Sequence, residues 1–313
     1  MTPRSFKFSG HETFPCRYAW LPKAYLALQE ARDAFANEEA AMVTLGLGKN
    51  MVRACRFWMQ ATGIAESVEG GYELTDFGIA LLDPNQGFDP YLEDVRTLWL
   101  LHWRLSSGAD EPLFAWDYML NRWQHPDMTR TAVIEEFVRE TQRMDRKLSV
   151  VTLEQHFDTF LHTYVPTRSR KGEVQEDNLD CPLVELELIQ KCGERPVDAS
   201  GKREVIYAFR REAKLEITAE VFVYCLNDFW DKRSPNERTM NFRDVAVAHG
   251  SPGQLFKLSE WDVRERMDTV AEDSGGVFRY QDSASQPQVS RSPERPTPME
   301  LLASIYAHQE AHA

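Results

Sequence analysis

Three basic residues and one amide recur at helical spacing between residues 49 and 60. They stand at positions i, i+4, i+7 and i+11 and are Lys49, Arg53, Arg56 and Gln60. At ~100° per residue these side chains fall within roughly 60° of one another and form one stripe along a helix. In the major groove Arg pairs with guanine and Gln with adenine, while Lys and the neighbouring Asn50 reach phosphate. The stripe therefore predicts contacts to duplex DNA.

The segments around this stripe predict how it is positioned. A helix is expected over 20–34, followed by a short helix capped by Asn37 and by the stripe helix over 49–62, which Gly63 ends. Two short strands over 64–68 and 72–74 follow, joined by a Glu-Gly-Gly turn, and Thr75 caps a helix over 76–82. This order is that of a winged helix-turn-helix.

The expected hairpin weakens the DNA interpretation. It carries Glu66, Glu69 and Glu73 and no Lys or Arg, so it would repel phosphates. The alternative for the stripe is the solvated polar face of an ordinary amphipathic helix.

Charge is unevenly distributed along the chain. The 313 residues carry a formal net charge of −13, which argues against a general nucleic-acid binder. Counted from the sequence, residues 1–65 hold eight Lys and Arg against five Asp and Glu, whereas residues 66–128 hold three against twelve. DNA contact is therefore expected to be local and confined to the N-terminal part.

Composition excludes several classes of protein. There is no apolar run of the roughly 18 residues that a membrane span needs and no secretory signal, so a cytoplasmic protein is expected. The five cysteines are too few and too scattered for a disulfide framework or a zinc site. They are Cys16, Cys55, Cys181, Cys192 and Cys225. No metal and no cofactor are expected.

The rest of the chain predicts a mainly α protein with small β-hairpins. Helices are expected over 97–123, 130–147, 219–230, 243–249 and 298–308. One further helix is expected after a capping box of Thr152 and Gln155, and another is expected to begin at Glu260 with Ser259 as its cap. Strands are expected over 203–217, 277–283 and 286–291. The predicted domains are a winged helix-turn-helix over 1–83, a helical middle segment over 84–165, a linker over 166–180, a winged-helix-like domain over 181–292 and a tail over 293–313.

Four motifs resemble a bacterial family, domain of unknown function 4007. They are FSGHETFP over 8–15, YELTDFG over 72–78, GFDPYLED over 87–94 and SPG-x-x-FKL over 251–258. The resemblance covers nearly the whole chain. It implies a gene neighbourhood of DNA phosphorothioation and phage defence, and hence a role at DNA beside other modification or defence proteins, but it names no activity.

The first of these motifs could itself carry function. Its candidate residues are His11 and Glu12, with Arg17 and Lys23 shortly after it. One hypothesis is a Cys16 nucleophile activated by His11. The alternative is that the stretch clamps the first helix.

An enzyme is the less favoured interpretation. Glu212-Ala-Lys214 after Asp198 imitates the acid-x-Lys arrangement of metal-dependent nucleases. In a chain with 49 acidic residues this spacing is expected by chance. We therefore expect a non-catalytic DNA-binding component of a phosphorothioation-type modification or phage-defence system. The alternatives are an assembly subunit that does not bind DNA and a nuclease, and a homo-oligomer remains open.

Overall fold

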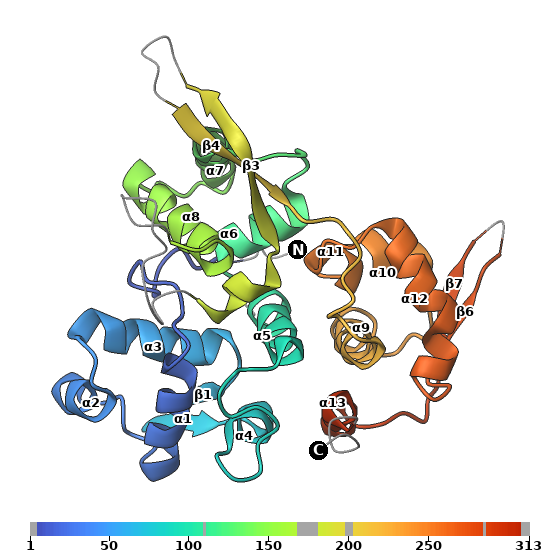
Figure 1. The fold of residues 1–313 in the computed structure, drawn as a ribbon, viewed down its shortest axis with the longest axis horizontal. Helices are drawn as coiled ribbons and strands as arrows, with labels where there is room; N and C mark the ends of the chain where they lie inside the picture. The colour runs from blue at the N-terminus through green and yellow to red at the C-terminus, as the bar shows by residue number, and fades with distance from the viewer. Residues whose placement is uncertain (1–4, 109–110, 168–180, 198–202, 284–285, 308–313) are drawn as a thin grey trace.

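The computed structural model describes residues 5–108, 111–167, 181–197, 203–283 and 286–307 (Figure 1). Helices dominate these residues, and the strands form two separate hairpins and one three-stranded sheet. This confirms the predicted class of a mainly helical chain with small β-hairpins. Three groups of elements meet at the helix α5 (Val95–Ser107) (Figure 1). None of the described helices is both long and apolar enough to cross a bilayer.

The first group is α1 (Trp20–Glu30), α2 (Glu38–Leu45), α3 (Lys49–Ala61), the hairpin of β1 (Ala65–Val68) and β2 (Gly71–Leu74), and α4 (Asp76–Leu82). The predicted caps form, because the Asn37 side chain accepts the N–H groups of Glu39 and Ala40, and that of Thr75 accepts the N–H of Gly78. Gly63 ends α3 with a φ of 73°, as expected of a C′ glycine.

The first helix is shorter than the predicted 20–34 and ends at Glu30. The reason is tertiary, since the Arg32 carbonyl accepts the N–H of Tyr72 at 2.9 Å. The chain after Glu30 therefore runs beside strand β2 instead of continuing the helix.

The middle group is α5, α6 (Phe114–Asp117), a π-helical turn (Tyr118–Arg122), α7 (Arg130–Arg143) and α8 (Val150–Tyr164). Trp99 and Trp103 are fully buried, as predicted. The expected helix over 97–123 was wrong, because α5 ends at Ser107 and α6 begins only at Phe114. The predicted Thr152 cap was also wrong: Ser149 caps α8 by accepting the Thr152 N–H at 3.0 Å.

A long hairpin projects beyond this group at the top of Figure 1. It follows a 3₁₀ turn (Pro182–Leu186) and pairs β3 (Ile189–Pro196) with β4 (Arg203–Phe209) in antiparallel register. The expected strand over 203–217 thus stops at Phe209. Most of the predicted linker, residues 168–180, lies outside the described residues.

The last group is built on α9 (Ala219–Arg233) and α12 (Glu260–Asp273), with α10 (Phe242–Val247) and α11 (Pro252–Leu255) between them. Its sheet has the order β5-β7-β6, from β5 (Thr239–Asn241), β6 (Phe278–Gln281) and β7 (Gln288–Arg291). The sequence did not predict β5. The Ser259 cap of α12 is confirmed, and Asp262 completes a capping box.

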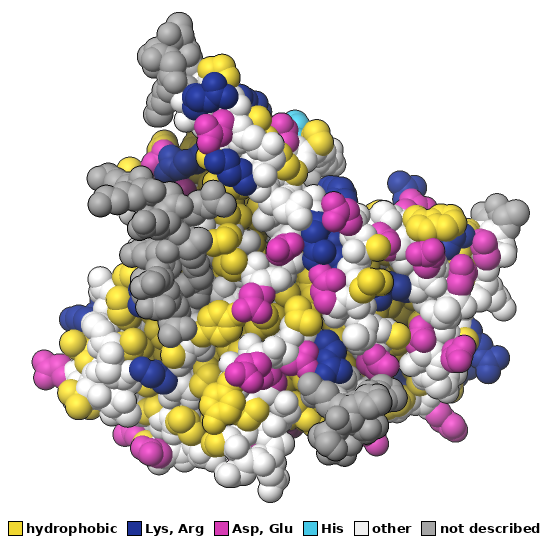
Figure 2. Space-filling view, in the orientation of Figure 1, with side chains coloured by type: hydrophobic (Ala, Val, Ile, Leu, Met, Phe, Trp, Pro, Cys, Tyr) yellow, Lys and Arg dark blue, Asp and Glu magenta, His cyan; other side chains and the backbone are white. Residues whose placement is uncertain are grey.

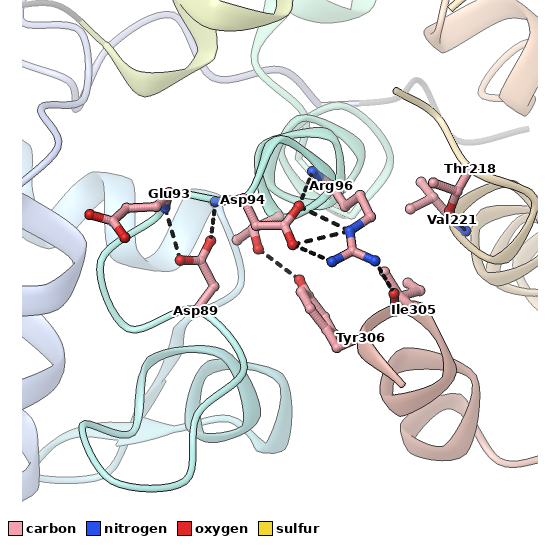
Figure 3. Close-up of polar contacts among 9 residues, drawn as sticks. Asp89, Glu93, Asp94, Arg96, Thr218, Val221, Ile305 and Tyr306 are labelled. Atoms are coloured by element: carbon pink, nitrogen blue, oxygen red, sulfur yellow. Dashed lines mark hydrogen bonds and ion pairs between the residues drawn. The ribbon is translucent and has the colours of Figure 1, made fainter. Parts of the chain in front are cut away.

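The GFDPYLED motif supports the docking of the last helix, α13 (Pro298–Tyr306), as Figure 3 shows. Asp89 accepts the backbone N–H groups of Glu93 and Asp94 and so fixes the turn before α5. Arg96 in α5 donates to the carbonyl of Ile305, and the Tyr306 ring stacks on Phe88 with centroids 4.7 Å apart. This motif therefore joins the first and last parts of the chain.

Candidate nucleic-acid interface

Helix α3 has one buried face and one exposed polar face. Val52, Cys55, Trp58 and Met59 are almost completely buried, whereas Lys49, Asn50 and Gln60 are exposed and Arg53 and Arg56 are half-buried. The buried face packs on α1, where the Cys55 thiol lies 3.4 Å from the carbonyl oxygen of Trp20. The five predicted DNA-contacting residues therefore share the accessible side of one helix.

Part of this basic charge is already compensated by Glu38 in α2. Arg53 Nε lies 2.6 Å from Glu38 Oε1, and Lys49 Nζ lies 3.3 Å from Glu38 Oε2. The hydrogen bond from Arg53 lowers the pKa of Glu38 below its ordinary value. In the part of the chain that the structure describes, Arg56 has no carboxylate partner. Among the described ion pairs of the stripe, Glu38 is therefore the single carboxylate set against three cations.

The FSGHETFP motif lies directly against α3. Its backbone adopts the left-handed region at Gly10, Glu12 and Thr13, with φ values of 112°, 48° and 64°. A Cβ atom on Gly10 would come within 2.7 Å of the Phe57 ring, so only glycine permits this approach. The hydrogen bond to Glu38 is the largest cause that raises the pKa of Arg53, and the nearby charge of Glu12 raises it further. The two predicted functional segments thus meet at one surface.

His11 anchors this motif inside the protein. Its Nε2 lies 2.9 Å from Nδ1 of His156 in α8, and the Ala115 N–H donates to His156 Nε2 at 3.0 Å. The Thr13 N–H likewise donates to His11 Nδ1 at 3.1 Å, so the outer nitrogen of each ring accepts a backbone N–H group. Burial lowers the pKa of His11 to about 4 and that of His156 well below its ordinary value. The pair is therefore neutral at pH 7.

The hypothesis of a Cys16 nucleophile activated by His11 gains no support from these contacts. The ring of His11 is hydrogen-bonded to His156, and the Cys16 thiol donates to the Arg17 carbonyl oxygen with a sulfur–oxygen distance of 3.7 Å. Burial raises the pKa of Cys16 well above its ordinary value, which disfavours the thiolate.

Arg17 and Lys23 lie beside the junction of α2 and α3. The Arg17 guanidinium lies over the ring of Trp20 at 5.4 Å, and its Nη1 is 4.0 Å from the sulfur of Met51. Lys23 Nζ donates to the carbonyl of Leu45 at the end of α2, at 3.0 Å. Both side chains therefore hold the junction of α2 and α3 in place and add positive charge next to the stripe.

The acid-x-Lys pattern does not form a nuclease-like arrangement. Lys214 is completely buried, and its Nζ donates to the backbone carbonyls of Arg210, Glu212 and Lys257 at 2.8, 3.1 and 3.3 Å. Asp198 lies outside the described residues. Across the described ranges, no three His, Cys, Asp or Glu side chains gather closely enough to hold a metal ion.

The family model described as "Protein of unknown function (DUF4007)" matches residues 8–306. The chain belongs to the DUF4007 family. Two solved structures, of SspB and of magnesium ion-bound SspB, are each similar to this DUF4007 chain with a TM-score of 0.78 and 26% identity. Each alignment covers 97% of this chain and 87% of the other. Among curated proteins no significant match was found.

Magnesium in one SspB structure raises the question of a similar site in this DUF4007 chain. The acidic run of the GFDPYLED motif does not provide one, because Asp89 accepts two backbone N–H groups and Asp94 pairs with Arg96 (Figure 3). Magnesium prefers carboxylate oxygens that remain free for the ion and its waters.

Proposed function

We propose that this DUF4007 protein is a non-catalytic DNA-binding component of a bacterial phosphorothioation-type DNA-modification or phage-defence system. In this proposal the first group of elements is a winged helix-turn-helix, and α3 is its recognition helix. The observation that carries the proposal is the stripe of Lys49, Arg53, Arg56 and Gln60, which stays accessible while the opposite face of α3 is buried.

The geometry at the start of α3 favours the binding of an anion there. Gly48 precedes α3 and provides no side-chain cap, so the first N–H groups and the positive end of the helix dipole face outward beside Lys49 and Asn50. Glu38 competes with phosphate for Lys49 and Arg53, which limits the affinity. Membership of the DUF4007 family supports the choice of system, since the family resemblance implies a neighbourhood of modification and defence genes.

A gel shift at low salt tests this proposal. Replacing Arg53 and Arg56 together by Ala should abolish the shift and leave the melting temperature nearly unchanged, because both side chains are only half-buried. The matched control replaces Arg139 and Arg143 of α7 by Ala, which are exposed and paired with carboxylates of their own helix. Unchanged binding by the α3 variant would exclude the assignment.

A second candidate function, assembly with a partner protein, is favoured by α12. This helix also precedes a hairpin, and it carries Trp261, Glu265, Asp268 and Glu272 at the spacing i, i+4, i+7 and i+11. Trp261 is 68% exposed, and within the described residues the three carboxylates form no ion pair. In Figure 2 acidic side chains flank exposed hydrophobic surface over this part of the molecule. An exposed Trp beside negative charge fits a basic segment of a protein from the same system.

Co-purification with the products of neighbouring genes tests this second candidate. Replacing Trp261 by Ala together with Glu265 by Lys should release a bound partner while leaving the DNA gel shift intact. The control replaces Val43 by Ala and Glu39 by Lys, which lie exposed on α2. A partner that is retained by the α12 variant would contradict the docking role, and light scattering separates a partner from a second copy.

A further inference from the structure

A cavity of about 190 Å³ opens at the end of α3, next to the basic stripe. Gln60, the last residue of the stripe, lines it together with Phe57 of the same helix. The other walls come from the N-terminal segment through Lys7, from the end of α5 through Arg104 and Leu105, and from Leu113 before α6. The cavity thus adjoins the proposed DNA surface and is built from four separate parts of the chain.

The Phe57 ring in this wall is held in place from two sides. It packs edge-on against Trp58, with centroids 5.3 Å apart, and against His11, with centroids 5.9 Å apart. Gly10 closes on the same ring so tightly that a Cβ atom would clash. The buried hydrogen bond between His11 and His156 in turn fixes His11. The FSGHETFP motif therefore supports an immobile aromatic surface at the cavity.

Polar groups of the cavity suit a heteroaromatic ring. The Gln60 amide donates one N–H to the Arg56 carbonyl at 3.1 Å, which leaves its second N–H and its oxygen for a ligand. Lys7 is exposed, and no carboxylate pairs with it among the described residues. Arg104 lies 4.5 Å over the ring of Phe77 and donates to the Tyr224 hydroxyl, so its guanidinium is fixed in the wall.

Other features of the lining disfavour a bare phosphate. Glu111 places a carboxylate at the cavity, which opposes an anion and can accept a hydrogen bond from an exocyclic amine. The buried side chains of Leu105 and Leu113 provide apolar wall. An aromatic surface, an amide and an acceptor are the groups that read an unstacked base.

We propose that this cavity receives one unpaired nucleobase of a DNA duplex held by the stripe. The inference rests on the proposed DNA-binding function and adds the class of ligand at its far end. Gln60 lies eleven residues, or about 16 Å along the helix, beyond Lys49, so duplex backbone and extruded base occupy opposite ends of α3. A base that is already unpaired costs the least to extract, which predicts a preference for bulged DNA.

The test compares a matched duplex with the same duplex carrying one extrahelical 2-aminopurine. The full-length protein should bind the bulged duplex about fivefold or more tightly, since stacking of one base on an aromatic ring is worth ~1 kcal/mol or more. Binding should also change the 2-aminopurine fluorescence. Lys7→Ala should remove the preference and leave the affinity for the matched duplex unchanged, and Gln60→Ala should remove the preference as well.

Phe57→Leu should remove the fluorescence change, with its fold checked by circular dichroism, and the two other variants keep the test valid if it does not fold. Equal binding of bulged and matched DNA by the wild-type protein would overturn the proposal that the cavity receives a base. A preference for bulged DNA that persists in Gln60→Ala would overturn it too. If the wild-type protein binds neither duplex, the proposed DNA-binding function itself is wrong. The two failures are therefore distinguishable.

Discussion

Arg53 and Glu38 form a close ion pair on the accessible face of α3, with Arg53 Nε 2.6 Å from Glu38 Oε1. Lys49 reaches the second oxygen of the same carboxylate at 3.3 Å. Phosphate oxygens would have to compete with this carboxylate for both cations. Glu38 therefore limits the affinity of the proposed DNA surface, which turns one acidic residue into a sensitive probe of it.

Replacing Glu38 by Gln should strengthen DNA binding. The change releases Lys49 and Arg53, so the slope of log K against log salt should steepen by about 0.9 for each further phosphate contacted. Fluorescence anisotropy of a labelled duplex over a salt series measures this slope. Glu39→Gln is the matched control, because Glu39 is exposed in the same first turn of α2 and pairs with no cation in the described part of the chain. Equal effects of both variants would show that only the overall charge matters.

The buried His11–His156 pair predicts a loss of stability in mild acid. Burial lowers the pKa of His11 from 6.5 to about 4, so the unfolded chain binds more protons than the folded chain between these values. The free energy of unfolding should therefore fall as pH decreases from 6.5 to 4, by up to about 1.4 kcal/mol per pH unit for this group. Urea unfolding at several pH values measures the effect.

His11→Gln should flatten this pH dependence. The control is His125→Gln, since His125 is exposed and should leave the slope unchanged. A wild-type slope that His11→Gln does not alter would mean that other groups cause the acid sensitivity.

Local sequence signals predicted much of the fold. The caps at Asn37, Thr75 and Ser259 and the ends of α3 depend on residues within a few positions of one another, and each was predicted. The stripe of α3 follows from periodicity alone. The position of Ser149 instead of Thr152 at the start of α8 shows the limit, because two hydroxyls close together offer competing caps.

Contacts between distant segments could not be predicted. His11 meets His156 across 145 positions, and Arg53 meets Glu38 only because α2 packs against α3. Strand β5 is three residues long and exists through its pairing with β7. The cavity beside Gln60 likewise needs Lys7, Arg104 and Leu113 to converge. Each of these features lies in tertiary packing that no single segment encodes.

Lys257 of the SPG-x-x-FKL motif predicts a pH dependence of the same sign, at alkaline pH. It is buried, its ammonium lies 4.5 Å over the ring of Phe209, and it donates to the carbonyl of Leu120. Burial lowers the pKa of Lys257 from 10.5 to about 7, with the charges of Arg211 and Lys214 adding to the effect. The unfolded chain therefore binds more protons between pH 7 and 10.5, and the free energy of unfolding should rise with pH in this range.

Lys257→Met should reduce this alkaline increase, measured by guanidinium unfolding between pH 7 and 10. Lys147→Met is the control, because Lys147 is exposed after α7. If both variants follow the wild-type curve, Lys257 is charged in the folded protein throughout this range and the predicted linkage is wrong.

Tyr306 at the end of α13 should contribute to the stability of the whole chain. Its hydroxyl lies 2.7 Å from the hydroxyl of Thr97 in α5, and Thr97 is completely buried. Tyr306→Phe leaves the Thr97 oxygen without this partner and should lower the free energy of unfolding by about 1–3 kcal/mol. Tyr306→Ala should lower the free energy of unfolding further, because the stacking on Phe88 is also lost.

Chemical denaturation measures the stability of both Tyr306 variants, with Tyr91→Phe as the control because Tyr91 is 70% exposed. Equal stabilities of Tyr306→Phe and Tyr91→Phe would show that the hydrogen bond to Thr97 does not secure α13.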